Sequence, residues 1–167
     1  MSEERELVLQ PLEAEAFAPY GDVLAGVGEP AVQTGWWRFW RASTYEHERG
    51  TVKLSVWTVE RIPFVVDELE RHLLETQAYV PLGTPYAIVV APPSAGDMPD
   101  LDRIAAFSSD GTRGFRLHRG TWHHYPFALH ERASFVTIHA REGGTADDMD
   151  MREDFEELTG VRFRLVL

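Results

Sequence analysis

Many short segments rich in β-branched and aromatic residues make up this chain, and turn-forming residues separate them. The clearest strand candidates are residues 52–59, 77–82, 86–91, 114–117, 134–139 and 161–167. Gly-Thr-Pro at 83–85 and Asp-Gly at 110–111 mark turns between such segments. Short strands with frequent turns, and without an alternating strand–helix rhythm, predict an all-β sandwich or barrel.

Helical signals are few. A helical turn is expected at residues 12–17, and a short helix at 152–158 with Gly160 as its stop. The sequence has no Gly-rich phosphate loop, no internal repeat and no convincing internal boundary. We therefore expect one domain spanning residues 1–167, which is long enough to bury a core.

Composition narrows the classes of function. The net charge of −11 disfavours binding to a phosphate backbone, so no nucleic-acid partner is expected. The absence of cysteine excludes disulfide scaffolds and thiol nucleophiles, and leaves His, Asp, Glu, Gln and water as metal ligands. The acidic start lacks the features of a signal peptide, and no apolar run approaches the roughly 18–20 residues that cross a bilayer. These features predict a cytoplasmic protein without a membrane partner.

The first informative polar segment runs from Glu70 to Gly83. Glu70 and His72 are two residues apart, so on an extended strand their side chains point the same way. Gln77 follows five residues later, and Gly83 six residues after that. This spacing resembles the first cupin motif, in which His-x-His, then Glu, then Gly supply metal ligands and a turn. It predicts metal ligands at Glu70, His72 and Gln77.

The second segment is HRGTWHH at residues 118–124. It resembles the other cupin motif, Pro-x-Gly-x-x-His, with His118 in place of the proline, Gly120 at the turn and His123 pointing back into the barrel. Together the two segments predict an all-β, cupin-like barrel (a double-stranded β-helix) with few short helices. His123 joins the predicted ligands Glu70, His72 and Gln77.

Other conspicuous residues have structural interpretations. His47 and His130 lie in polar surroundings and are expected to be structural or on the surface. The aromatic cluster at 36–40 is more typical of core or dimer packing than of a substrate platform. Asp147, Asp148 and Asp150 lack the ligand spacing of a calcium loop and are expected to be solvated.

At these positions the sequence resembles the ureidoglycolate lyase family. The segments that carry the resemblance are LERH at 69–72, TQAYVP at 76–81 and HRGTWHH at 118–124, supported by APYGDV at 18–23 and FVTI at 135–138. The resemblance runs in order over roughly residues 7–144. It implies a cupin-like, dimeric lyase of purine (allantoin) breakdown that splits ureidoglycolate into glyoxylate and urea. It also implies a nickel ion, and zinc or no metal are the alternatives.

The expected reaction assigns roles to particular residues. Cleavage needs a base for the substrate hydroxyl and an acid for the departing urea nitrogen, and the predicted catalytic residues are His118, His123 and Gln77. The substrate is a small carboxylate. The residues predicted to bind it are Arg119, Arg71, Arg41 and Trp122.

The chain also departs from the family pattern. Glu75 stands where a small residue is usual, and the arginines near the start are displaced. These departures favour an alternative function, that of a cupin lyase, isomerase or epimerase acting on another small hydroxy or sugar acid. A non-catalytic cupin that binds a small molecule is a further alternative.

Overall fold

The computed structural model of the protein describes residues 2–26, 28–35, 38–44, 50–142 and 151–167. Trp36, Trp37, His47 and the acidic segment 143–150, which the sequence interpretation singled out, lie outside the described residues. Strands dominate the described part. None of its helices is long and apolar enough to cross a membrane.

Two helices and one 3₁₀ turn accompany the strands in the described ranges. The helices are α1 (Ala14–Phe17) and α2 (Phe155–Thr159), and the turn is η1 (Leu101–Arg103). The strands are β1 (Glu3–Pro11), β2 (Gly21–Leu24), β3 (Val32–Gln33), β4 (Arg38–Phe39), β5 (Gly50–Glu60), β6 (Val65–Val66), β7 (Glu68–Arg71), β8 (Glu75–Pro81), β9 (Tyr86–Ala91), β10 (Ala105–Ser109), β11 (Gly114–Leu117), β12 (Trp122–His123), β13 (Phe127–Ala128), β14 (Arg132–Glu142), β15 (Met151–Asp154) and β16 (Val161–Val166).

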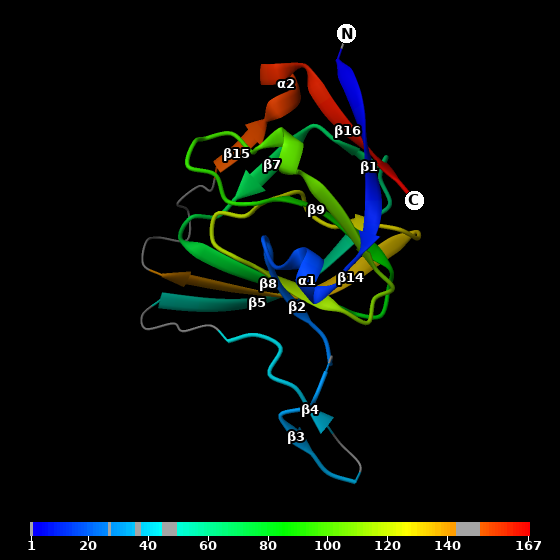
Figure 1. Cartoon of the computed structure of the whole chain (residues 1–167), viewed down its shortest axis with the longest axis vertical. Helices are drawn as coiled ribbons and strands as arrows, with labels where there is room; N and C mark the ends of the chain where they lie inside the picture. The colour runs from blue at the N-terminus through cyan, green and yellow to red at the C-terminus, as the bar shows by residue number, and fades with distance from the viewer. Residues whose placement is uncertain (1, 27, 36–37, 45–49, 143–150) are drawn as a thin grey trace.

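Two large sheets form the barrel. One has the order β15-β7-β12-β9-β10-β1-β16-β6, with β13 also paired to β9, and the other has the order β2-β11-β8-β14-β5. Figure 1 shows the two sheets curling around a common interior, with β5, β8 and β14 on one side and β9 and β7 on the other. This arrangement is the predicted cupin-like barrel, and the expected strands at 52–59, 77–82, 86–91, 114–117, 134–139 and 161–167 are all confirmed.

Strand β9 separates two apolar clusters. Its six side chains are fully buried, so its sequence is continuously apolar rather than alternating. Tyr86, Ile88 and Val90 face the space between the two sheets, where they pack with the rings of β8, β11 and β14. Ala87, Val89 and Ala91 face the other way, toward β16 and α2. A residue that pairs directly with Tyr86, Ile88 or Val90 therefore faces the interior, and one that pairs with Ala87, Val89 or Ala91 faces the outer cluster.

The two ends of the chain differ from the expectation. Residues 3–11 form a strand that pairs in parallel with both β16 and β10, which no local pattern indicates. The helix expected at 152–158 starts only at Phe155, because residues 151–154 pair with β7 instead. Gly160 ends that helix in the left-handed conformation, as predicted.

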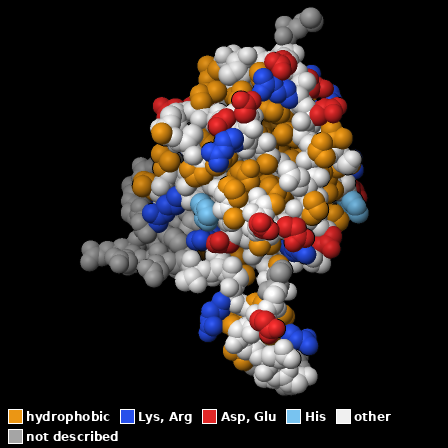
Figure 2. Space-filling view, viewed as in Figure 1, with side chains coloured by type: hydrophobic (Ala, Val, Ile, Leu, Met, Phe, Trp, Pro, Cys, Tyr) orange, Lys and Arg blue, Asp and Glu red, His pale blue; other side chains and the backbone are white. Residues whose placement is uncertain are grey.

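A small hairpin stands apart from the barrel. Strands β3 and β4 pair with each other in a sheet of their own. Figure 1 shows them at the end of an arm that extends away from the barrel, and Figure 2 shows both basic and acidic side chains on that arm. Of the aromatic cluster predicted at 36–40, Phe39 lies on β4 in this arm, and neither Phe39 nor Trp40 is part of the barrel core.

Candidate active site

Glu70 and His123 face the barrel interior because of their strand register. His123 on β12 pairs with Glu70 on β7 and with Val90 on β9. Directly paired residues share a face of the sheet, and Val90 belongs to the interior cluster. His72 follows β7 two residues after Glu70, as the spacing predicted. The sequence therefore places both histidines and the carboxylate at the same end of the barrel.

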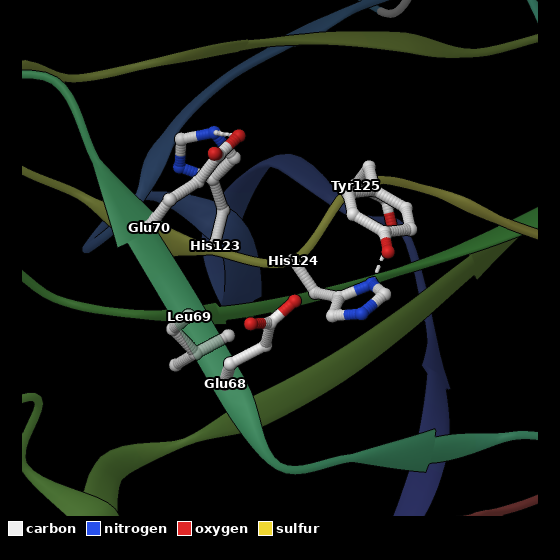
Figure 3. A pocket seen from close by; sticks show the side chains of 6 residues that line it. All are labelled: Glu68, Leu69, Glu70, His123, His124 and Tyr125. Carbon is white, nitrogen blue, oxygen red and sulfur yellow. Dashed lines mark hydrogen bonds and ion pairs between the residues drawn. The ribbon is translucent and has the colours of Figure 1, made fainter. Parts of the chain in front are cut away.

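Three side chains converge there. The ligand atoms of Glu70, His72 and His123 all lie within 4.8 Å of one another. Oε1 of Glu70 is 3.8 Å from Nε2 of His72 and 3.5 Å from Nε2 of His123, and the two imidazole rings are 5.2 Å apart. Figure 3 shows the carboxylate of Glu70 beside the ring of His123. The two residues line a small pocket together with Glu68, Leu69, His124 and Tyr125.

The state of His123 suits a metal ligand. Its Nδ1 lies 3.0 Å from the carbonyl oxygen of Thr121, and because a carbonyl only accepts, Nδ1 carries the proton. Nε2 then has the lone pair. It is buried and has no hydrogen-bond partner among the described residues. Burial and the neighbouring His72 lower the pKa of His123 to about 3, so the ring is neutral at physiological pH.

A divalent cation fits this group of donors. Two imidazole nitrogens and one carboxylate form a donor set that transition metals accept, and the remaining positions stay open for substrate or water. The carbonyl of Thr121 fixes the orientation of the His123 ring from behind, as partners of metal ligands commonly do. The residues present therefore fit a divalent metal at Glu70, His72 and His123, and the donor set alone does not select one metal.

Gln77 is engaged in a different interaction. It is buried on β8, where its amide nitrogen donates to Oε1 of Glu75 at 3.2 Å and its amide oxygen accepts from the hydroxyl of Tyr79 at 2.9 Å. Both amide groups are thus held by neighbours on its own strand. These contacts give no support to the predicted role of Gln77 as a fourth ligand, and its catalytic role stays a prediction.

His118 and Arg119 lie on the turn that follows β11. The ring of His118 is 42% exposed and its Nε2 is 4.0 Å from Oδ1 of Asp22. Arg119 is exposed beside Gly120, whose φ of 75° confirms the tight turn expected there. The metal-compatible group includes neither residue. An acid–base role for His118 and a carboxylate-binding role for Arg119 remain predictions.

Arg71 and Trp122 lie on the other side of the sheet. Each is next in sequence to an interior residue, and alternation turns it to the opposite face. Trp122 is fully buried in the outer cluster, and its indole nitrogen donates to Ser94. The guanidinium of Arg71 covers that indole at 4.4 Å and donates to the carbonyl of Ser94. These contacts are structural and give no support to substrate binding by Arg71 and Trp122, which stays a prediction.

Arg41 also lies apart from the convergent group. It is exposed in the arm, with its guanidinium 5.7 Å from the ring of Phe39. Positive charge at inward-facing register positions comes instead from Arg141 of β14 and from the exposed Lys53 of β5. Arg141, which is 8% exposed, pairs in register with Glu75, and Lys53 pairs with His139.

The sequence interpretation missed a hydrogen-bonded pair opposite the metal-compatible group. Nδ1 of His139 on β14 lies 2.6 Å from Oε1 of Glu75 on β8. Burial alone would raise the pKa of Glu75, but hydrogen bonds from His139 and Gln77 outweigh it and lower that pKa to about 2. One signal was available in the sequence, because His139 is in phase with the buried Phe135 and Thr137 on its strand.

A barrel with two histidines and a carboxylate converging on its interior defines a cupin-like protein with a candidate metal site. Comparison with known proteins then gives its family. The sequence model described as "Ureidoglycolate lyase" matches residues 4–160. The chain belongs to the ureidoglycolate lyase family, which places it among the lyases.

Named relatives cover nearly the whole chain. "Ureidoglycolate lyase" of Pseudomonas syringae pv. syringae (strain B728a) is 37% identical over 153 residues, which are 86% of this chain and 89% of that protein. "Ureidoglycolate lyase" of Pseudomonas fluorescens (strain SBW25) is 35% identical over 162 residues, 92% of this chain and 96% of that protein. The protein of the same name from Stutzerimonas stutzeri (strain A1501) is 34% identical over 159 residues, which are 90% of this chain and 92% of that protein.

Solved structures are more distant. RmlC from Streptococcus suis matches 57% of this chain and 46% of its own with a TM-score of 0.43 and 10% identity. An oxalate decarboxylase structure matches 65% of this chain and 25% of its own with a TM-score of 0.42 and 15% identity. At these scores the two structures add nothing to the description of the site.

Proposed function

We propose that the protein is a ureidoglycolate lyase that breaks a carbon–nitrogen bond in ureidoglycolate, releasing glyoxylate and urea. The observation that carries the proposal is the convergence of Glu70, His72 and His123 on the barrel interior of a chain that matches this family over residues 4–160. The reaction would belong to the breakdown of allantoin, as the family resemblance implies.

The substrate carries a hydroxyl, a carboxylate and a ureido nitrogen on one carbon. Glu70, His72 and His123 would hold a divalent metal, which acts as a Lewis acid on oxygen atoms of the substrate when bound. Arg141 and Lys53 supply positive charge for the carboxylate at the same end of the barrel. Nickel is the metal implied by the family resemblance, and zinc is the main alternative.

The test is the release of urea and glyoxylate from ureidoglycolate by protein purified without an affinity tag. Turnover is expected, together with about one equivalent of bound divalent metal, and chelation should abolish it. Glu70→Gln and His123→Ala should lose the metal and lower kcat at least about 100-fold. The matched control is His130→Gln, because His130 is exposed on the turn before β14. Absence of turnover in metal-loaded wild-type protein would refute the proposed function.

One observation favours a second function. The ionised carboxylate of Glu75 lies inside the barrel, and the electrostatic interaction with the nearby His72 ring contributes to the low pKa of the Glu75 carboxyl. A negative charge there favours a substrate that turns hydroxyl groups, and not its carboxylate, toward β8, as an acid with more hydroxyl groups than ureidoglycolate can do. Turnover of another hydroxy or sugar acid by protein inactive on ureidoglycolate would support this cupin lyase, isomerase or epimerase.

We also propose that the protein is a homodimer. Strand β5 is an edge strand, and its outward side chains Val52, Leu54 and Val56 are 50%, 70% and 75% exposed. In register they continue onto Val136 and Ile138 of β14, which makes one apolar face. Such a face is typical of a subunit interface.

Replacement of Leu54 by glutamate should convert the dimer to a monomer in light-scattering measurements. Leu158→Glu is the matched control, because Leu158 is a comparably exposed leucine (64%) on α2, away from this face. A wild-type monomer at micromolar concentration would contradict the proposal.

A further inference from the structure

Glu75 and His139 form a close polar pair inside the barrel. The 2.6 Å contact joins Oε1 of Glu75 on β8 to Nδ1 of His139 on β14, 64 residues apart in the sequence. The side chain of Glu75 is 10% exposed and that of His139 is 27% exposed. The carboxylate is therefore enclosed, while part of the imidazole faces open space.

We propose that His139 is the proton-transfer residue of this active site, and that Glu75 is the residue that positions it. The inference rests on the proposed ureidoglycolate lyase function and adds a catalytic group to it. Neither residue belongs to the metal-compatible group of Glu70, His72 and His123.

A chain of hydrogen bonds fixes the pair. Tyr79 donates its hydroxyl to the amide oxygen of Gln77, and Gln77 donates its amide nitrogen to the carboxylate of Glu75. An ionised carboxylate only accepts, so Nδ1 of His139 must be the donor in the 2.6 Å contact. In the neutral ring the lone pair is then on Nε2. A carboxylate that holds a histidine in one tautomer and orientation is the arrangement found in catalytic triads.

The pair faces the metal-compatible group across the barrel. Glu75, Gln77 and Tyr79 alternate inward along β8, and Tyr79 packs in the interior cluster. Strands β7 and β12 belong to one large sheet, and β8 and β14 belong to the other. A substrate held by the metal-compatible group would thus lie between the two sheets, facing β8 and β14.

The charged and titratable groups around His139 come from four directions. Glu75 lies beside it on β8, Lys53 pairs with it from β5, and Arg141 lies two residues further along β14 on the same face. On the opposite sheet, His123 lies on β12 and His72 directly follows β7. Only Glu75 makes a short hydrogen bond to the His139 ring among the contacts described.

His139 is better placed for proton transfer than the other candidates. His123 is 1% exposed, and its Nε2 points into the metal-compatible group. His118 is on an exposed turn, and Asp22 is 4.0 Å from it. His139 alone of these three combines a held Nδ1 with a partly open ring.

The proposed step balances without a further reactant. Nε2 of His139 accepts the proton of the substrate hydroxyl, and the electron pair of that O–H bond forms the new carbonyl of glyoxylate. The carbon–nitrogen bond breaks, and its electron pair goes to the nitrogen of urea. His139 then donates the same proton to that nitrogen and returns to the neutral tautomer that Glu75 holds.

The experiment compares three variants with the wild type. His139→Ala should lower kcat at least about 100-fold, with KM and bound metal unchanged, and added imidazole should restore part of the rate. Glu75→Gln should lower kcat while Glu75→Asp keeps more of it, because only a carboxylate holds the tautomer. His130→Gln is the matched control, and circular dichroism checks that each variant is folded. Near-normal kcat in folded His139→Ala would overturn the proposal and leave the proposed function intact.

A second readout does not depend on turnover. In ¹⁵N NMR of metal-loaded wild-type protein, His139 should be the Nδ1-protonated tautomer, and added glyoxylate should shift its Nε2 resonance but not the resonances of His130. If ureidoglycolate is not turned over but this shift is seen, the substrate assignment fails and the placement of His139 stands. If glyoxylate leaves His139 unchanged, the proposal is overturned whatever the activity.

Discussion

Replacing Arg71 by methionine is expected to destabilise the fold by about 3 kcal/mol and to leave the chemistry in place. The side chain of Arg71 is 5% exposed. Its bond to the carbonyl of Ser94 is charge-assisted, 2.9 Å long, and worth roughly 1.5–3 kcal/mol. Its stacking on Trp122 at 4.4 Å is desolvated and worth about 2 kcal/mol. The ion pair with Asp97 adds little, because that carboxylate is 77% exposed. Methionine recovers part of the loss by filling the same space over the indole.

The assay is urea unfolding at one fixed protein concentration, followed by far-UV circular dichroism. For a chain of this length a loss of about 3 kcal/mol corresponds to a melting temperature lower by roughly 6–12 °C. Arg61→Met is the matched control, because Arg61 also donates to a backbone carbonyl and covers a phenylalanine ring, but at the surface. It should change stability by less than about 1 kcal/mol.

The result that would refute this reasoning is the reverse pattern. An Arg71→Met variant of wild-type stability whose KM for ureidoglycolate is raised 100-fold would place the guanidinium at the substrate, contrary to its contacts with Ser94 and Trp122. It would also mean that the strand alternation used to orient Glu70 is wrong, because the two residues are neighbours on β7.

Two further predictions concern stability. In metal-free protein the pKa of His123 is about 3 in the folded state against 6.5 for the ordinary group. As the pH falls, the unfolded chain therefore takes up the proton first. The free energy of unfolding should decrease by several kcal/mol between about pH 6.5 and pH 3, and His123→Gln should remove this dependence. An equal dependence of the free energy of unfolding on pH in the two proteins would contradict the assignment. Gly111 has a φ of 94°, and a Cβ there would lie 2.6 Å from the amide nitrogen of Thr84, so Gly111→Ala should lower the melting temperature by several degrees. Gly96→Ala is the control, because a Cβ at Gly96 meets nothing within 4 Å. An equal effect of the two substitutions on the melting temperature in calorimetry would count against the strain argument.

Local spacing in the sequence was enough to predict the three residues of the metal-compatible group. Glu70 and His72 at i and i+2, and His123 after the turn at Gly120, were predicted from pattern alone and converge as expected. The same alternation also argues against Arg71 and Trp122 as substrate residues, because each directly follows or precedes an interior residue on a strand. The prediction treated the motif as a set of neighbours and did not apply the two-residue period to it.

Pairing between distant strands could not be predicted. Glu75 and His139 are brought together by the register of β8 against β14, and no local signal sets that register. The parallel pairing of β1 with β16 joins the two ends of the chain in the same way. Residues 152–154 were expected to be helical, but the free edge of β7 pairs with them and overrides their local preference.

The interior of the barrel changes character along its length, and this explains how the site is held. Toward one end of β8 and β14, Tyr79 and Phe135 pack against Tyr86 and Phe115 with ring centroids 4.9–6.0 Å apart. Toward the other end the same two strands carry Glu75 and His139. Because a strand transmits its position rigidly over a few residues, the packed aromatic end fixes the spacing of the polar end. Replacing Phe135 by alanine should therefore cost about 3–5 kcal/mol and also loosen the contact between Glu75 and His139.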